Sequence, residues 1–392
     1  MAAQHRNYGV QVFGQAVTVF TSVDPVPGGS SLDEIRVVQP VAGVRAHILD
    51  GKLEFIGSAN FEGWTIPEGE LTPGAFGEGY VDRRHPHTYF HELMLSVTDP
   101  LGTLDGDLRV SLSGGKGFAT FGTDDPMSRP PLRYPVNHHF SQILERAVAI
   151  AGIAYGPVMI EGSIFNGDEP ETPEQWPLLD RFGDSWALRV TLFPIEGLEI
   201  QWSAADVHSP EHRPGAGLEV TKKSLSSRWD GRVKGLPVYL LLEWAETSEA
   251  DRFFVFDSYL VEAQVKPGRH RAYYRGERTE RPEEHRTLSR FRTVRPHIEN
   301  SLVGITNWNI HTLGYGVTVG RFLRGLGVEP FTEISYATVS SVGGGLFRPE
   351  QFYGGTSFWA VSLGLRLDWR MQGHRMGRYG VAAGSMTPGM RQ

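Results

Sequence analysis

Apolar and polar side chains alternate with a period of two along most of the chain. The clearest run spans 357–370, where the apolar set is Trp359, Val361, Leu363, Leu365, Leu367 and Trp369. The positions between them are mostly polar or small, and similar runs begin at Leu53, Trp186 and Leu198. A period of two is typical of a β-strand with one apolar face. Tryptophan at both ends of such a face is typical of a strand that crosses a bilayer.

Twelve further segments favour strands, although several carry apolar residues at both parities. With the four clear runs they bring the number of predicted strands to sixteen. The twelve segments are 8–20, 42–48, 87–98, 107–121, 143–155, 157–165, 218–229, 236–247, 254–265, 269–278, 310–320 and 328–339.

The links between the predicted strands alternate in length. Six odd-numbered links are long, at 21–41, 65–86, 122–142, 166–184, 279–309 and 340–356. Even-numbered links are mostly short, as at 50–52, 156, 194–197 and 266–268. Short turns at one end and long loops at the other are typical of outer-membrane barrels with periplasmic termini. We therefore predict an all-β fold, a transmembrane antiparallel β-barrel of about sixteen strands with short periplasmic turns and long extracellular loops.

A soluble β-sandwich, or a pair of them, is the alternative fold. A sandwich would also alternate, but it has no reason to sort its links by length, and few of its strands would be as long as 357–370. The alternation ends with that run. We therefore predict one barrel domain over residues 1–370 and a flexible periplasmic C-terminal tail over 371–392.

Composition narrows the function classes. The 392 residues include 38 basic and 45 acidic ones, and the net charge of -7 argues against nucleic acid as a partner. The chain has no cysteine, which excludes disulfides and thiolate metal sites. It lacks the run of about eighteen apolar residues that a transmembrane helix requires. The opening residues show no signal peptide, although a barrel needs one for export; a trimmed or misassigned start would account for this.

Four short segments stand out by their order and spacing. They are Asp82-Arg83-Arg84-His85-Pro86-His87, His138-His139, Ile160-Glu161-Gly162-Ser163-Ile164-Phe165-Asn166-Gly167 and Asp184-Ser185-Trp186. Across roughly residues 80–370 the chain resembles a poorly characterised family of bacterial outer-membrane, porin-like barrels. The resemblance implies an outer-membrane location and a genomic setting of metal or copper handling, with no established substrate. One departure is that such barrels usually end on the aromatic residue of the last strand, whereas here a tail follows Trp369.

Arginine outnumbers lysine 32 to 6, and its positions indicate a charged lumen. In the predicted strand 269–278, Arg269, Arg271 and Arg275 share one face. Arginine facing lipid at the bilayer midplane costs roughly 2–4 kcal/mol, so this face is expected to point inward. On other predicted strands, Glu54, Glu62, Glu329 and Glu333 also occupy positions expected to face the lumen. We predict that these residues line the lumen and set its selectivity; mutual neutralisation in a plugged interior is the alternative.

Two groups of side chains are candidate metal ligands. His85 and His87 would lie on one face of an extended segment, about 6.6 Å apart, and a third ligand could come from His91, His138 or His139. In the predicted tail, Met371, His374 and Met376 are soft or intermediate donors that suit Cu(I). The alternatives are a hydrogen-bonded loop cluster for the histidines and an accidental composition for the tail. The implied cofactor is copper or another transition metal, if any.

The chain shows no motif of a hydrolase, zinc protease or phosphate-binding loop. We therefore expect no enzyme but a porin-like outer-membrane channel for small solutes or ions, with copper handling as a hypothesis. The alternatives are a closed barrel that binds a partner or serves a structural purpose, and an outer-membrane enzyme that acts on lipid. The expected partners are the outer-membrane bilayer, the barrel assembly machinery and small solutes.

Overall fold

The structure is a computed structural model, and it describes residues 9–24, 32–49, 51–65, 88–100, 108–129, 145–170, 172–208, 219–284, 302–322, 325–343, 348–371 and 374–383. Strands dominate these ranges. The helical elements are short: α1 (Glu62–Thr65), α2 (Pro349–Tyr353) and two single 3-10 turns, η1 (Pro126–Ser128) and η3 (Gly380–Ala382). In the part of the chain described, no helix is long and apolar enough to cross a membrane.

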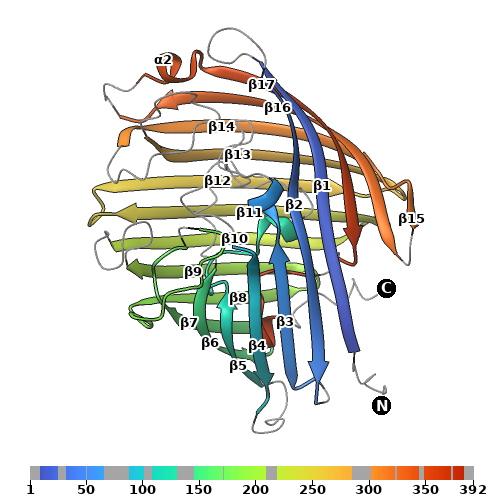
Figure 1. Cartoon of the computed structure of the whole chain (residues 1–392), viewed down its shortest axis with the longest axis vertical. Coiled ribbons are helices and arrows are strands. Elements are labelled where there is room, and N and C mark those ends of the chain that lie inside the picture. Colours follow the sequence, from blue (N-terminus) through green and yellow to red (C-terminus); the bar gives the residue numbers. More distant parts are fainter. Residues whose placement is uncertain are drawn as a thin grey trace.

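All strands belong to one antiparallel sheet (Figure 1). In chain order they are β1 (Gly9–Asp24), β2 (Leu32–Ile48), β3 (Leu53–Asn60), β4 (Phe90–Thr98), β5 (Arg109–Gly117), β6 (Arg146–Tyr155), β7 (Val158–Phe165), β8 (Ser185–Ile195), β9 (Leu198–His208), β10 (Glu219–Val233), β11 (Leu236–Glu249), β12 (Phe254–Val265), β13 (His270–Glu284), β14 (Leu302–Val317), β15 (Gly320–Phe322), β16 (Leu326–Ser341) and β17 (Ser357–Trp369). The three-residue β15 lies in the link between β14 and β16, which pair directly with each other. Sixteen longer strands therefore form the wall.

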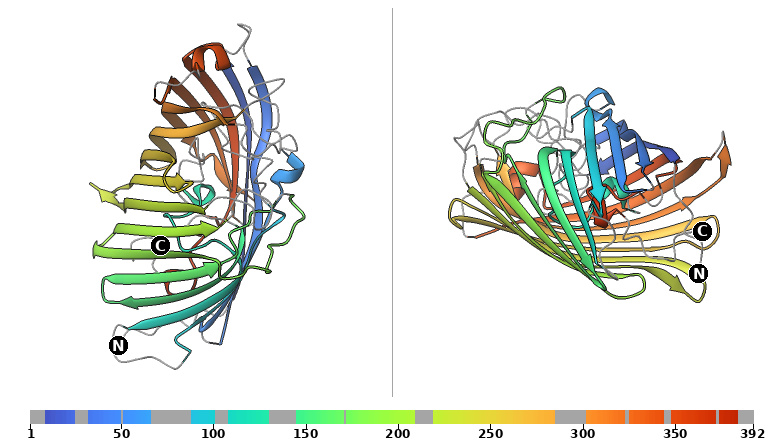
Figure 2. Two further views of the ribbon diagram at one scale, coloured as in Figure 1. Left: turned by 90° about the vertical axis from the view of Figure 1, so that its left-hand side faces the viewer. Right: turned by 90° about the horizontal axis from the view of Figure 1, so that it is seen from below.

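Pairing between the first and last strands closes the sheet. β1 pairs with β2 on one side and with β17 on the other, where the register runs from Gly14 opposite Trp369 to Asp24 opposite Trp359. Closure leaves no open sheet edge, which a bilayer does not tolerate. Figure 2 shows the strands curving around a common interior. The predicted closed barrel of about sixteen antiparallel strands is confirmed.

Two predicted links are shorter in the structure because the strands continue further. Within the segment predicted as a link at 21–41, β1 continues to Asp24 and β2 already begins at Leu32. A β-bulge in β2 places both Gln39 and Pro40 opposite Ala16. The bulge changes the phase of the alternation and so hides the first half of β2 from a period-two pattern. Within the segment predicted as a link at 279–309, β13 continues to Glu284 and β14 already begins at Leu302. The pattern missed the end of β13 because it carries charged residues at both parities.

The outer face of the barrel is apolar up to a sharp boundary on the long-loop side. The register aligns Trp202, Leu225, Trp244 and Tyr259 in one row across four strands, β9 to β12. Two residues beyond this row, the outer positions become charged: Lys223 faces Glu246, and Glu246 faces Asp257. On β11 the outward positions are apolar from Leu236 to Trp244, a span of about the nine residues that a tilted strand needs to cross hydrocarbon. This row marks the membrane boundary.

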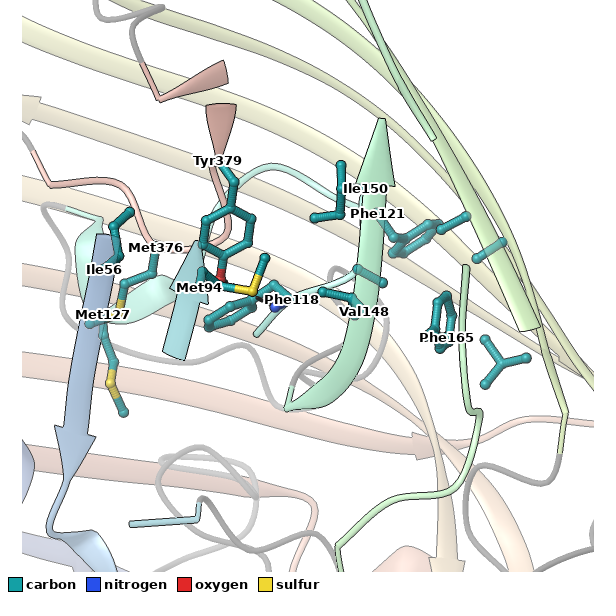
Figure 3. Close-up of a cluster of buried hydrophobic side chains, with 14 of the residues drawn as sticks. Ile56, Met94, Phe118, Phe121, Met127, Val148, Ile150, Phe165, Met376 and Tyr379 are labelled. Atoms are coloured by element: carbon teal, nitrogen blue, oxygen red, sulfur yellow. Dashed lines mark hydrogen bonds between the residues drawn. The ribbon is translucent and has the colours of Figure 1, made fainter. Parts of the chain in front are cut away.

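The inner face of the wall is buried and largely polar, but two apolar clusters also lie inside. One gathers around Trp308 of β14, whose ring contacts Tyr353 of α2 and Phe358 of β17. The other contains Met94, Phe118, Met127, Met376 and Tyr379 (Figure 3). Its members come from wall strands and from two non-strand segments, so the interior is packed with protein at this level.

The prediction of a flexible tail after residue 370 is wrong for residues 371 and 374–383. Met371, Met376 and Tyr379 are at most 3% exposed, and they pack inside the barrel. The chain turns at Arg370, which has φ 57, and re-enters the interior from the short-turn end. The segment lacks period-two alternation because it is not a strand, so its polar and apolar residues do not sort into two faces. Residues 372–373 and 384–392 lie outside the described ranges.

The closed sheet predicts resistance to detergent. Expressed with a signal peptide and purified in mild detergent, the unheated protein should migrate faster in gel electrophoresis than the boiled protein, because a sheet without edges has no strand from which to unravel. Circular dichroism of the unheated sample should be strand-dominated. Helical spectra, or a protein that stays soluble and monomeric without detergent, would contradict the fold.

Candidate functional site

The barrel interior is the candidate functional site, because charged side chains gather there in ion pairs. The central pair joins neighbouring strands: Arg189 of β8 donates from Nε and Nη2 to the two carboxylate oxygens of Glu161 on β7, both at 2.8 Å. Both residues are about 1% exposed. Two parallel bonds of this kind are among the strongest polar contacts in proteins.

The chain after β5 enters the interior as an inserted segment, residues 118–129. Thr120 Oγ1 donates to the carbonyl of Ala187 on β8 at 3.0 Å. Further along, Asp124 accepts from Arg228 of β10 at 2.7 Å, and the carbonyl of Met127 accepts from Gln15 of β1 at 3.0 Å. Because β10 and β1 lie on different sides of the barrel, this segment crosses the lumen.

A second segment, residues 371 and 374–383, here called the C-terminal segment, meets the first. Arg375 donates to Glu199 of β9 at 2.5 Å and to Asp124 of the inserted segment at 3.2 Å. The hydroxyl of Tyr379 donates to Glu92 of β4 at 2.8 Å and accepts from the backbone N–H of Phe118 at 3.3 Å. The two segments therefore pack against each other inside the barrel, and carboxylates of the wall strands bind them.

The same contacts determine the charge states of the two segments. Burial alone would raise the pKa of Asp124, but the guanidinium groups of Arg228 and Arg375 hold it well below its ordinary value. Burial and the nearby carboxylate of Glu92 raise the pKa of Tyr379 well above its ordinary value. Asp124 is therefore an anion and Tyr379 a neutral hydrogen-bond donor at physiological pH.

Most of the predicted lumen residues lie on the inner face. Arg271 and Arg275 are buried on β13; Arg271 donates to Glu329 of β16 at 2.8 Å, and Arg275 donates to Glu277 at 3.0 Å. Glu333 accepts from the hydroxyl of Tyr273 at 2.5 Å. Their part in selectivity remains a prediction.

The other predicted lumen residues have different surroundings. Glu54 is buried on the inner face of β3 and accepts from Arg45 at 3.0 Å. Glu62 is fully buried in α1 and accepts the backbone N–H of Gln39 at 2.7 Å, so it stabilises the bulge of β2. Arg269 is exposed in the turn before β13, and its prediction as an inward-facing residue is wrong because the strand begins one residue later.

The metal predictions are not tested in full. His85, His87, His138 and His139 lie outside the described residues. His91 is buried on β4, and its Nδ1 lies 2.7 Å from Glu145 Oε1. Met371 and Met376 pack in the apolar cluster, and the ring of His374 stacks on Phe13 at 4.2 Å between centroids. Within the described ranges, no group of three or more His, Asp or Glu is placed to hold a metal ion.

The sequence pattern missed the centre of the site. Glu161 and Arg189 were not predicted as site residues. A signal for them existed, because both occupy inward positions of neighbouring predicted strands, and they lie directly opposite in the β7–β8 register. Arg375 and Arg378 were missed because they lie in a segment without alternation. Asp124 was missed because it falls in the predicted extracellular loop 122–142, whose described part, 122–129, lies inside the barrel.

A closed antiparallel sheet with an apolar outer face and a charged, occupied interior defines a sixteen-stranded transmembrane β-barrel. Its fold is similar to that of an anion-selective porin from Comamonas acidovorans (TM-score 0.54, 11% identity, 93% of this chain and 100% of that one). It is also similar to OprB from Pseudomonas putida (0.54, 9%, 92% and 94%) and to a loop-deletion mutant of OmpT, an outer-membrane protein of Vibrio cholerae (0.50, 12%, 92% and 99%). No family model matches the chain, and no curated protein matches it significantly. At these identities the likeness concerns the fold alone.

Breaking the central pair should destabilise the barrel. Glu161→Gln leaves the guanidinium of Arg189 buried without a counter-charge, so the free energy of unfolding should fall by about 3–5 kcal/mol. Urea titration in lipid vesicles would measure this. The matched control is Arg109→Gln, because Arg109 pairs with Asp99 at the surface and is 54% exposed. That change should cost less than about 1 kcal/mol. Equal losses in both variants would contradict the importance of the buried pair.

Proposed function

We propose that this chain is a porin-like channel of the bacterial outer membrane that carries small solutes or ions. The observation that carries the proposal is the division of charge between the two faces. Outer positions such as Leu240, Leu242 and Val361 are apolar and exposed, whereas ionisable side chains are collected on the inner face. Charges inside a membrane protein are costly and typically mark the path of a polar substrate.

The size class of the solute follows from the packing of the interior. A barrel of sixteen strands is wide enough for an aqueous channel. Here the inserted segment crosses that space, and inner residues such as Glu92, Ser203 and Thr306 are fully buried. This favours small solutes or ions over larger substrates. The anion-selective porin among the similar folds supports ion conduction as the activity to measure first.

Three finer points belong to the same proposal. The chain acts without catalysis; an outer-membrane enzyme acting on lipid is the less favoured alternative. It reaches the membrane by export and is folded there by the barrel assembly machinery. A link to copper handling rests on the family resemblance and on the soft donors Met371, His374 and Met376.

Ion selectivity tests the proposal. Replacing Arg271 and Arg275 by Glu changes the inner charge of β13 by four units, which should shift the reversal potential in a salt gradient towards cation selectivity. The matched control is Arg278→Glu on the same strand, because Arg278 is exposed on the outer face. Its reversal potential should stay at the wild-type value.

Planar-bilayer recordings separate the proposal from its main alternative. Discrete conductance steps from the wild-type protein would support a channel. Folded, heat-modifiable protein without any conductance would favour a closed barrel that binds a partner. A shift of equal size in the Arg278 variant would contradict the assignment of Arg271 and Arg275 to the lumen.

A further inference from the structure

The C-terminal segment does not belong to the barrel wall. Among its described residues, none pairs with a strand, and closure is completed by β1 and β17 before the segment begins. Its backbone-to-backbone hydrogen bonds are internal turns, apart from one long contact of 3.4 Å from the N–H of Asp125 to the carbonyl of Met376; its other described backbone hydrogen bonds go to side chains of the wall. The barrel can therefore keep its full hydrogen bonding whether or not this segment stays inside.

Side chains hold the segment against one wall. Arg375 binds Glu199, Arg378 donates to Gln201 at 2.5 Å, and Tyr379 donates to Glu92. Nearer the short-turn end, Val381 and Ala382 pack on Met159, and the N–H of Val381 donates to Ser111 Oγ at 3.0 Å. In Figure 3, Met376 and Tyr379 lie among Phe118 and Met94.

These contacts can be exchanged for water. The polar wall groups that bind the segment are carboxylates, an amide, a hydroxyl and the guanidinium of Arg189, all of which hydrate well when their partners leave. The place that the segment occupies in the lumen also brings three positive charges together, those of Arg189, Arg375 and Arg378. Burial and the guanidinium groups of Arg189 and Arg375 lower the pKa of Arg378 well below its ordinary value, because they disfavour its positive charge. The apolar contacts of Met376 and Tyr379 oppose release, so the seated state is favoured.

We propose that the C-terminal segment, residues 371 and 374–383, forms a plug that closes the lumen from the short-turn end and withdraws through that mouth to let solutes pass. This inference rests on the proposed channel function and adds its regulation. The chain follows the last wall strand, turns at Arg370 and enters the lumen from the short-turn end. It returns towards the short turns at Val381, helped by Gly377 and Gly380, which have φ 81 and 57. Because of this path, all the side chains that attach the segment to the wall lie within a few consecutive residues, which can leave the lumen together.

A disulfide lock tests the plug directly, because the wild-type chain contains no cysteine. A Cβ built on Gly152 of β6 would lie 2.8 Å from Cγ2 of Val381. The double variant Gly152→Cys/Val381→Cys therefore brings two thiols within reach of a disulfide. Conductance of the same preparation is recorded in planar bilayers before and after a membrane-impermeant reductant. Wild type with the same reductant and Val381→Cys alone are the controls.

We expect the oxidised double variant to conduct several-fold less than its reduced form, with both controls insensitive to reductant. A second variant that ends at Arg370 should conduct at the highest level, and its heat-modifiable gel mobility verifies that it is folded. Equal conductance of the oxidised and reduced forms, while wild type conducts, would overturn the plug and leave the channel standing. No conductance in any variant, including the truncation, would overturn the channel itself. Failure of the two cysteines to cross-link would contradict the seated position.

Discussion

The ion pair of Glu161 and Arg189 connects the barrel wall to everything that fills it. Besides its two bonds to Glu161, Arg189 donates to the carbonyl of Gly377 in the C-terminal segment at 3.2 Å and to that of Gly122 in the inserted segment at 3.4 Å. Closing a sheet in a bilayer forces such an arrangement. The outer face must be apolar, so polar residues are confined to the inner face. Where protein packs against them, each charge requires a partner.

Some of those partners come from the inserted segment as well as from the wall. Arg228 of β10 donates to Asp230 of its own strand at 2.7 Å, and it also donates at 2.7 Å to Asp124, which the inserted segment carries across the lumen. Arg129 of the same segment lies 3.2 Å from Glu243 of β11. The inserted and C-terminal segments therefore neutralise wall charges as well as occupying space. Removing them exposes those charges to water without disturbing the backbone ladder.

The parts predictable from sequence are those that a local period encodes. Along 357–370 the exposed residues Trp359, Val361 and Leu363 alternate with the buried Ala360 and Ser362, as the pattern predicts. Parity alone also placed Arg271 and Arg275 on the inner face. It failed at Gln39, where a bulge shifts the phase. It also failed for 118–129 and 371–383, whose positions depend on contacts with residues far away in the sequence, such as Asp124 with Arg228. No local pattern contains that information.

The inner ion pairs are of two kinds, those between wall strands and those between the wall and the C-terminal segment, and the two kinds suggest different roles in the lumen. Arg271 with Glu329 and Arg275 with Glu262 join wall strand to wall strand, so they persist whatever fills the interior. Arg375 with Glu199 joins a removable segment to the wall and exists only while that segment is seated. Charges of the first kind are fixed in space and can set the potential that an ion meets. In the proposed plug, charges of the second kind change partners when the segment moves, so they would determine whether the path is open. Selectivity and closure can therefore be altered by separate residues of one barrel.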